Sequence, residues 1–161
     1  CRQRRVGHMN VAREAVMAAL AALLEGVVFA SAVNGQTGFV SVSRRLKIWA
    51  DVPKSQRPAL FISEHREQPN YQSEALPAKT TLSVDLFIYI DASDRNTIPA
   101  SALNTILDAL DAALTASPMA NNRQTLGGLV SHCRVDGAVL KDPGDLDGDG
   151  LLWVPLKILA L

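Results

Sequence analysis

Cysteine is nearly absent from this chain of 161 residues, which has two. Cys1 lies in CRQRRVGH, a basic and aperiodic stretch just before Met9. We interpret residues 1–8 as an expression-tag remnant and residues 9–161 as a single domain, although a basic nucleic-acid-binding arm is the alternative for 1–8. Cys133 then stands alone, which excludes an intrachain disulfide and suits a reducing compartment.

An excess of positive charge is also missing. Without Arg2, Arg4 and Arg5, the 16 basic residues become 13 against 16 acidic ones, a net charge of −3. This balance argues against a general DNA-binding surface, so we expect no sequence-specific nucleic-acid partner. The longest apolar run, Ala15 to Leu24, is about half of the roughly 20 residues that a membrane helix needs, so we expect no membrane partner.

Motifs that would indicate catalysis are missing too: there is no nucleophile elbow, phosphate loop or zinc-spaced set. His65 has Glu64 and Glu67 nearby, but adjacent strand residues point to opposite faces and no second histidine is close. Cys133 is expected in the core rather than as a nucleophile beside His132. We therefore expect no enzyme and no cofactor, with a small hydrolase using one of these histidines as the poorest alternative.

Two amphipathic helices are predicted. The first runs from a cap at Asn10 to about Glu25, with Gly26 ending it. The second has Pro99 in its first turn and ends before Pro118. Their predicted apolar stripes are Val16, Leu20, Leu23 and Val27 in the first helix and Leu103, Ile106, Leu107, Leu110 and Leu114 in the second.

Strands are predicted at 59–65, 80–90, 129–140 and 151–161, with an exposed loop over 66–79. In the strand 80–90, Leu82 and every second residue after it should face the core. Pro155 indicates a sheet edge or a bulge. Between 27 and 58, Asn34-Gly35 suggests a protruding hairpin and LKIWADVP a short strand.

The expected fold class is therefore α+β, with a two-layer arrangement. A mostly antiparallel or mixed sheet packs against two helices, in the order α-β-β-β-α-β-β. Gly127-Gly128 precedes a strand rather than a helix, so these glycines favour a bend or a close subunit contact over an anion site.

The segment KDPGDLDGDG contains alternating aspartates that resemble half of an EF-hand loop. Asp145, Asp147 and Asp149 would occupy positions 1, 3 and 5, with Gly150 at position 6. Position 12 should be a bidentate glutamate, and it is Leu156. We favour a hairpin turn and expect no metal, and keep a weak cation site as the alternative.

The order of elements resembles the tail terminator, or tail completion, proteins of long-tailed bacteriophages, of the lambda-like minor tail protein U type. The resemblance covers about residues 10–161 and is carried by the alanine-rich first helix and by four later segments: RPALFISEHREQPNYQ, KTTLSVDLFIYIDAS, PASALNTILDALDAAL and QTLGGLVSHCRVDGAVLKDPGDLDGDGLLWVPLKILAL. The segment around residues 27–45 matches least.

The resemblance implies a structural virion protein that caps the tail tube, ends its polymerisation and presents the head-joining surface. Its partners would be further copies of itself, in a ring of six subunits, together with the tail-tube protein and the head–tail connector protein. The ring would sit in the virion tail after assembly in the bacterial cytoplasm, and genome DNA would pass through it. Candidate interface residues are Arg44, Arg45, Lys47, Phe87, Tyr89 and Trp153.

Two other functions remain open. Another phage head–tail connector or a tail-tube subunit would also be small, ring-forming and free of catalytic residues. A calcium-dependent binding module would use Asp145, Asp147 and Asp149.

Overall fold

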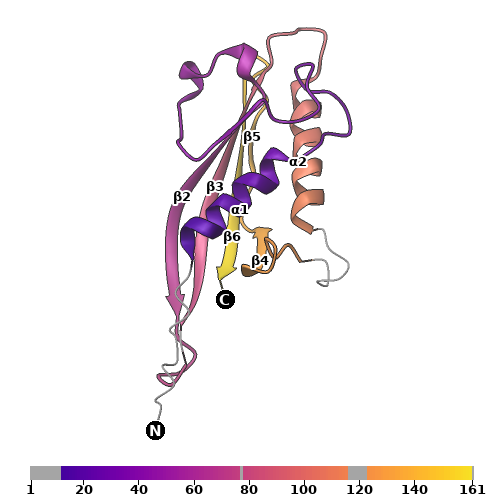
Figure 1. The fold of residues 1–161 in the computed structure, drawn as a ribbon. Helices are drawn as coiled ribbons and strands as arrows, with labels where there is room; N and C mark the ends of the chain where they lie inside the picture. Colours follow the sequence, from indigo (N-terminus) through magenta and orange to yellow (C-terminus); the bar gives the residue numbers. More distant parts are fainter. Residues whose placement is uncertain (1–11, 77, 116–122, 161) are drawn as a thin grey trace.

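A computed structural model describes residues 12–76, 78–115 and 123–160 (Figure 1). The predicted remnant 1–8, the cap at Asn10 and the stop at Pro118 lie outside these residues. The described elements are α1 (Arg13–Glu25), β1 (Ser41–Ser43), the short 3-10 helices η1 (Trp49–Asp51) and η2 (Lys54–Gln56), β2 (Ala59–Asn70), β3 (Lys79–Asp91), α2 (Pro99–Thr115), β4 (Val130–Val135), β5 (Leu140–Asp142) and β6 (Asp149–Ala160).

The fold is α+β, as predicted: one mixed sheet of six strands packs against two helices among the described residues. The strand order is β1-β2-β3-β6-β4, and β5 also pairs with β6. β1 is parallel to β2, and every other pair is antiparallel. β3 and β6 lie in the middle, where each is hydrogen-bonded on both sides.

Alternation along β3 separates the two faces of the sheet. Leu82, Val84, Leu86, Ile88 and Ile90 are buried, as predicted. They form one core with the buried stripes of α1 and α2 and with alternate residues of β6. We call this side the helix face and the opposite side the outer face.

Both helices bury a stripe close to the predicted one. In α1 the buried residues are Val16, Met17, Leu20 and Leu24, whereas Leu23 is only partly buried. The buried face of α1 is therefore rotated from the predicted one: it includes Met17 and Leu24 in place of Leu23. In α2 the buried residues are Leu103, Ile106, Leu110 and Leu114, with Leu107 again only partly buried.

The predictions for residues 27–58 were wrong in two places. Asn34 and Gly35 have positive φ angles of 51° and 74°, as a tight turn requires, but the turn closes a single bridge between Val33 and Gln36 rather than a hairpin of strands. Buried Val27, Phe29 and Val33 hold this stretch against the core. LKIWADVP contains η1, not a strand.

β2 is longer than predicted because residues 66–70, expected in a loop, continue pairing with β3. The sequence signal is hidden by their exposure and by Pro69. A register shift between Glu64 and Arg66 marks a β-bulge. Pro69 and Asn70 pair with Thr80 and Lys79, which lie past the last β3 residue paired with β6, so the ends of β2 and β3 project from the sheet as a two-stranded ribbon (Figure 1).

The strand predicted over 129–140 is divided into β4 and β5. Gly137, with φ of 125°, crosses so close to Pro155 that an added Cβ would lie 3.0 Å from the proline ring. Pro155 was expected at an edge or bulge, but it lies in β6 between β3 and this interruption. The Pro155 carbonyl accepts a hydrogen bond from the Asp136 N–H at 3.1 Å. The proline nitrogen, which has no hydrogen to donate, points to the same side of β6, where the neighbouring strand is interrupted between β4 and β5.

A second register shift, between Val130 and His132, decides which residues of β4 face the core. Val130 and Cys133 are buried, whereas Leu129, predicted in the core, is exposed. The placement of Cys133 in the core is confirmed.

Candidate interface surfaces

The segment 44–58 covers the upper part of the outer face. Val52 from this segment packs with Ala59, Phe61 and Tyr89 in a small apolar cluster, separate from the main core. The Tyr89 hydroxyl donates to the Lys47 carbonyl at 2.7 Å. Tyr89 is only 5% exposed, and partial burial raises its pKa. This candidate interface residue therefore holds the covering segment in place and offers no free surface.

Arg57 holds the same segment against the sheet. Its side chain is buried, and it donates to the carbonyls of Trp49, Val52 and Ile90 and to the carboxylate of Asp149. A buried guanidinium needs such complete pairing, because an unpaired buried charge is costly. The sequence does not distinguish Arg57 from its exposed basic neighbours, so its role was missed.

The other basic candidates in this segment differ from one another. Arg44 binds Glu14 at 2.8 Å and Glu64 at 3.1 Å, which ties the chain after β1 to α1 and β2. The hydrogen bond from Arg44 lowers the pKa of Glu14. Arg45 and Lys47 are exposed. Of the candidates in this segment, only these two have side chains at the surface without an ion pair among the described residues.

An apolar row lies uncovered beside the segment. Phe87 and Trp153 are paired across β3 and β6, and their rings stack with centroids 5.3 Å apart. Leu140 is paired with Trp153 on the other side and is 53% exposed. The structure thus brings two predicted interface residues, Phe87 and Trp153, together, and adds Leu140, which the sequence did not single out.

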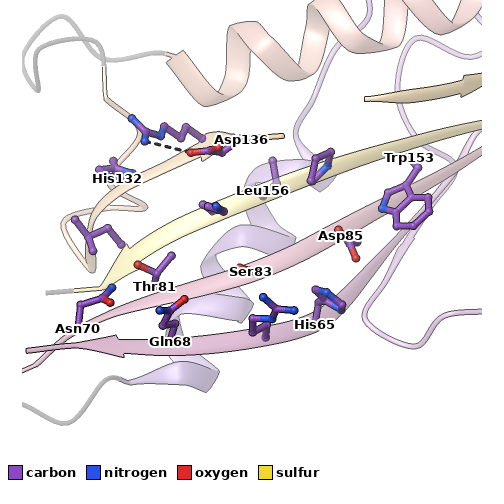
Figure 2. A pocket seen from close by; sticks show the side chains of 15 residues that line it. His65, Gln68, Asn70, Thr81, Ser83, Asp85, His132, Asp136, Trp153 and Leu156 are labelled. Carbon is purple, nitrogen blue, oxygen red and sulfur yellow. Dashed lines mark hydrogen bonds and ion pairs between the residues drawn. The ribbon is translucent and has the colours of Figure 1, made fainter. Parts of the chain in front are cut away.

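Below this row, the outer face is hollowed over about 630 Å³ (Figure 2). The strands β2, β3, β6 and β4 supply its lining. The bulge in β2 places Arg66 opposite Ser83, and Ser83 is paired in turn with Lys157, which is paired with Arg134. These three cations therefore form one row across the sheet. Regular alternation would place Arg66 on the helix face with Glu64, so this row of cations could not be predicted from the sequence.

The rest of the hollow is mixed in character. Asp85 and Asp136 lie on its lining, and Arg134 binds Asp136 at 3.2 Å. Nδ1 of His132 is buried without a partner among the described residues. Burial and the cations Arg134 and Arg123 lower the pKa of His132, which favours a neutral ring near pH 7.

The acidic segment is a loop between β5 and β6, as the turn interpretation predicts. Gly144 has φ of 77°, and an added Cβ would lie 2.5 Å from the Asp149 backbone, so only glycine fits. The three aspartates have separate roles. Asp149 binds Arg57, Asp147 accepts from the Asp149 N–H at 3.0 Å, and Asp145 is exposed.

The other candidates are also apart from one another. His65 lies at the bulge, and Glu67 is engaged by Arg13 at 2.7 Å. Burial raises the pKa of the Cys133 thiol to about 12, so this cysteine is a poor nucleophile. Gly127 and Gly128 have positive φ angles in a turn that leads into β4.

Within 12–76, 78–115 and 123–160, no three His, Cys, Asp or Glu residues are grouped as metal ligands would be.

A comparison with protein-family models gives no match, and a comparison with curated proteins gives none either. Among the described helices, none has the length and apolar character to cross a membrane. A function for this chain has to be inferred from its own residues and surfaces.

Proposed function

We propose that this chain is a structural subunit that caps the tail tube of a phage or prophage, ends its polymerisation and provides the surface for head joining. The observation that carries the proposal is the order of elements, in which an alanine-rich helix, an alternating central strand, a second amphipathic helix and a final acidic hairpin follow one another. That order is the basis of the resemblance to tail terminator proteins.

The character of the outer face supports the proposal. Trp153 and Leu140 expose apolar surface next to a polar hollow, with no covering element among the described residues. Exposed apolar surface bordered by polar residues is typical of protein–protein contacts. In this proposal the chain binds copies of itself, the tail-tube protein and the head–tail connector protein, in a ring through which genome DNA passes.

The test is deletion of the gene from the phage or prophage that encodes it. We expect overlong or uncapped tails and unjoined, DNA-filled heads, and we expect plasmid-borne wild-type protein to restore normal particles. Trp153→Asp should restore them poorly, whereas Ala22→Asp, on the exposed side of α1, serves as the matched surface control. Normal-length tails on infectious particles after deletion would contradict the proposal.

A further inference from the structure

Two cations of the outer-face hollow have no acidic partner in the part of the chain that the structure describes. Arg66 and Lys157 lie on either side of Ser83 in the register of the sheet, and neither forms an ion pair with a described residue. Leu159 and Pro155 line the same hollow. The site therefore combines two available positive charges with apolar surface on either side of Lys157.

The tip of the acidic loop has the complementary pattern. Asp145 and Asp147 flank Leu146, whose side chain is fully exposed at 103%. Neither aspartate forms an ion pair with a described residue. The Gly148 N–H donates to the Gly144 carbonyl at 2.9 Å, and Asp147 caps the Asp149 N–H, so the loop is held in shape before it meets a partner.

One chain cannot bring these two features together. The loop enters β6 at Asp149, which is paired with Asp91, whereas the β3 residues that line the hollow are Thr81, Ser83 and Asp85. The eight residue steps from Asp91 to Ser83 span about 27 Å of antiparallel strand. The loop and the hollow consequently lie towards opposite ends of the sheet.

We propose that the acidic loop of one copy docks into the outer-face hollow of a second copy, with Leu146 on Leu159 and Pro155 and its two flanking aspartates beside Arg66 and Lys157. The contact joins two different patches, so it is heterologous and repeats from copy to copy, which closes into a ring or continues as a filament. The inference rests on the proposed function only for the choice of a ring.

A nucleic-acid backbone fits this hollow less well. The apolar residues Leu159 and Pro155 in its lining offer a sugar–phosphate chain no polar contact, whereas the exposed Leu146 side chain of the loop can pack on them. The chain without residues 1–8 also carries a net negative charge, which disfavours phosphate binding in general.

Disulfide trapping between copies tests the contact. In the full chain with Cys1→Ser, one protein carries Leu146→Cys and another carries Ser83→Cys, and the two are mixed under mild oxidation. We expect a disulfide-linked heterodimer, and a chain with both cysteines should give a ladder of covalent oligomers. Leu146→Cys with Ala22→Cys is the control, because Ala22 is exposed on the helix face of the molecule.

Charge reversal provides the second arm. Asp145→Lys with Asp147→Lys should lower the trapping rate at least tenfold, about 1.4 kcal/mol, and Arg66→Asp with Lys157→Asp in the partner should restore it. Asp108→Lys with Asp111→Lys, on the exposed side of α2, makes the same change in net charge and should have little effect. The charge variants replace exposed side chains, Ser83 is partly buried, and the thermal midpoints of all variants check that they are folded.

Equal trapping of the Ala22 control, no trapping at all, or unchanged trapping after charge reversal would each overturn the inference. Binding of duplex DNA that Arg66→Asp and Lys157→Asp abolish, without trapping, would assign the hollow to nucleic acid instead. The gene deletion tests the tail function separately. Docking without a tail phenotype would remove the proposed function alone, and a tail phenotype without docking would remove this inference alone.

Discussion

The guanidinium of Arg57 donates to the carboxylate of Asp149, 92 residues further along the chain. This pair joins the segment that covers the upper outer face to the start of β6, where the acidic loop ends. Arg57 also binds three backbone carbonyls, two of them within the covering segment. One buried side chain therefore holds together the covering segment, the end of β3 and the base of the loop.

Replacing Arg57 should be the most damaging single change in this region. Arg57→Met would leave the Asp149 carboxylate and the carbonyls of Trp49 and Val52 without their donor. Breaking a buried pair in this way costs about 3–5 kcal/mol, which urea denaturation would measure. Arg45→Met, an exposed neighbour, should change stability by less than about 0.5 kcal/mol. Equal effects of the two substitutions would show that Arg57 is not the anchor.

Calcium should not stabilise the protein. Asp149 is engaged by Arg57, and Leu156, buried in β6, occupies the position of the missing glutamate. We expect the same thermal midpoint in EDTA and in excess Ca²⁺. A site filled at 100 times its dissociation constant would add about 2.7 kcal/mol, and Asp145→Asn would then remove that gain. A shift of several degrees that Asp145→Asn abolishes would support the calcium-binding alternative.

The two neighbouring apolar residues of α2 should differ in their effect on stability. Ile106 is fully buried, and Leu107 is only partly buried. Ile106→Ala should cost about 2–5 kcal/mol through the lost contacts and the cavity that remains. Leu107→Ala should cost clearly less, although the sequence placed both residues on one stripe. A larger loss at Leu107 in urea denaturation would reverse the assignment of the buried face.

The sequence predicted the elements whose periodicity is set by one buried face. Buried residues alternate along β3 from Thr80 to Ile88, and Tyr89 is buried as well because the segment 44–58 covers it, so the residues facing the main core could be identified from the pattern alone. α2 repeats its leucines at helical spacing for the same reason. These patterns, together with the turn residues of the acidic loop, were enough to predict an α+β fold.

The outer-face hollow could not be predicted, because two bulges change the phase of the alternation. Arg66 reaches the outer face only because of the irregularity after Glu64. Val130 replaces Leu129 in the core through the shift before His132. The role of Arg57 was hidden for a different reason: its partners are mostly backbone carbonyls, which leave no pattern in the sequence.

Acid should weaken the contacts between α1 and the sheet. Hydrogen bonds from Arg44 lower the pKa of Glu14, and a hydrogen bond from Arg13 lowers the pKa of Glu67. A carboxylate whose pKa is lowered in the folded protein makes its full contribution to stability at pH values above its ordinary pKa of 4.5. That contribution is lost as the pH falls through their values in the folded state.

The urea midpoint should therefore fall as the pH is lowered from about 5 to about 3, and Glu14→Gln with Glu67→Gln should reduce that fall. The double variant should also start lower at pH 7, because it lacks both charged contacts. Glu25→Gln is the matched control, since Glu25 is an exposed glutamate of α1 that forms no ion pair with a described residue. Since both pairs are at the surface, 0.5 M NaCl should weaken the difference between the wild type and the double variant. A parallel pH profile for the wild type and the double variant would show that these two ion pairs do not hold α1 against the sheet.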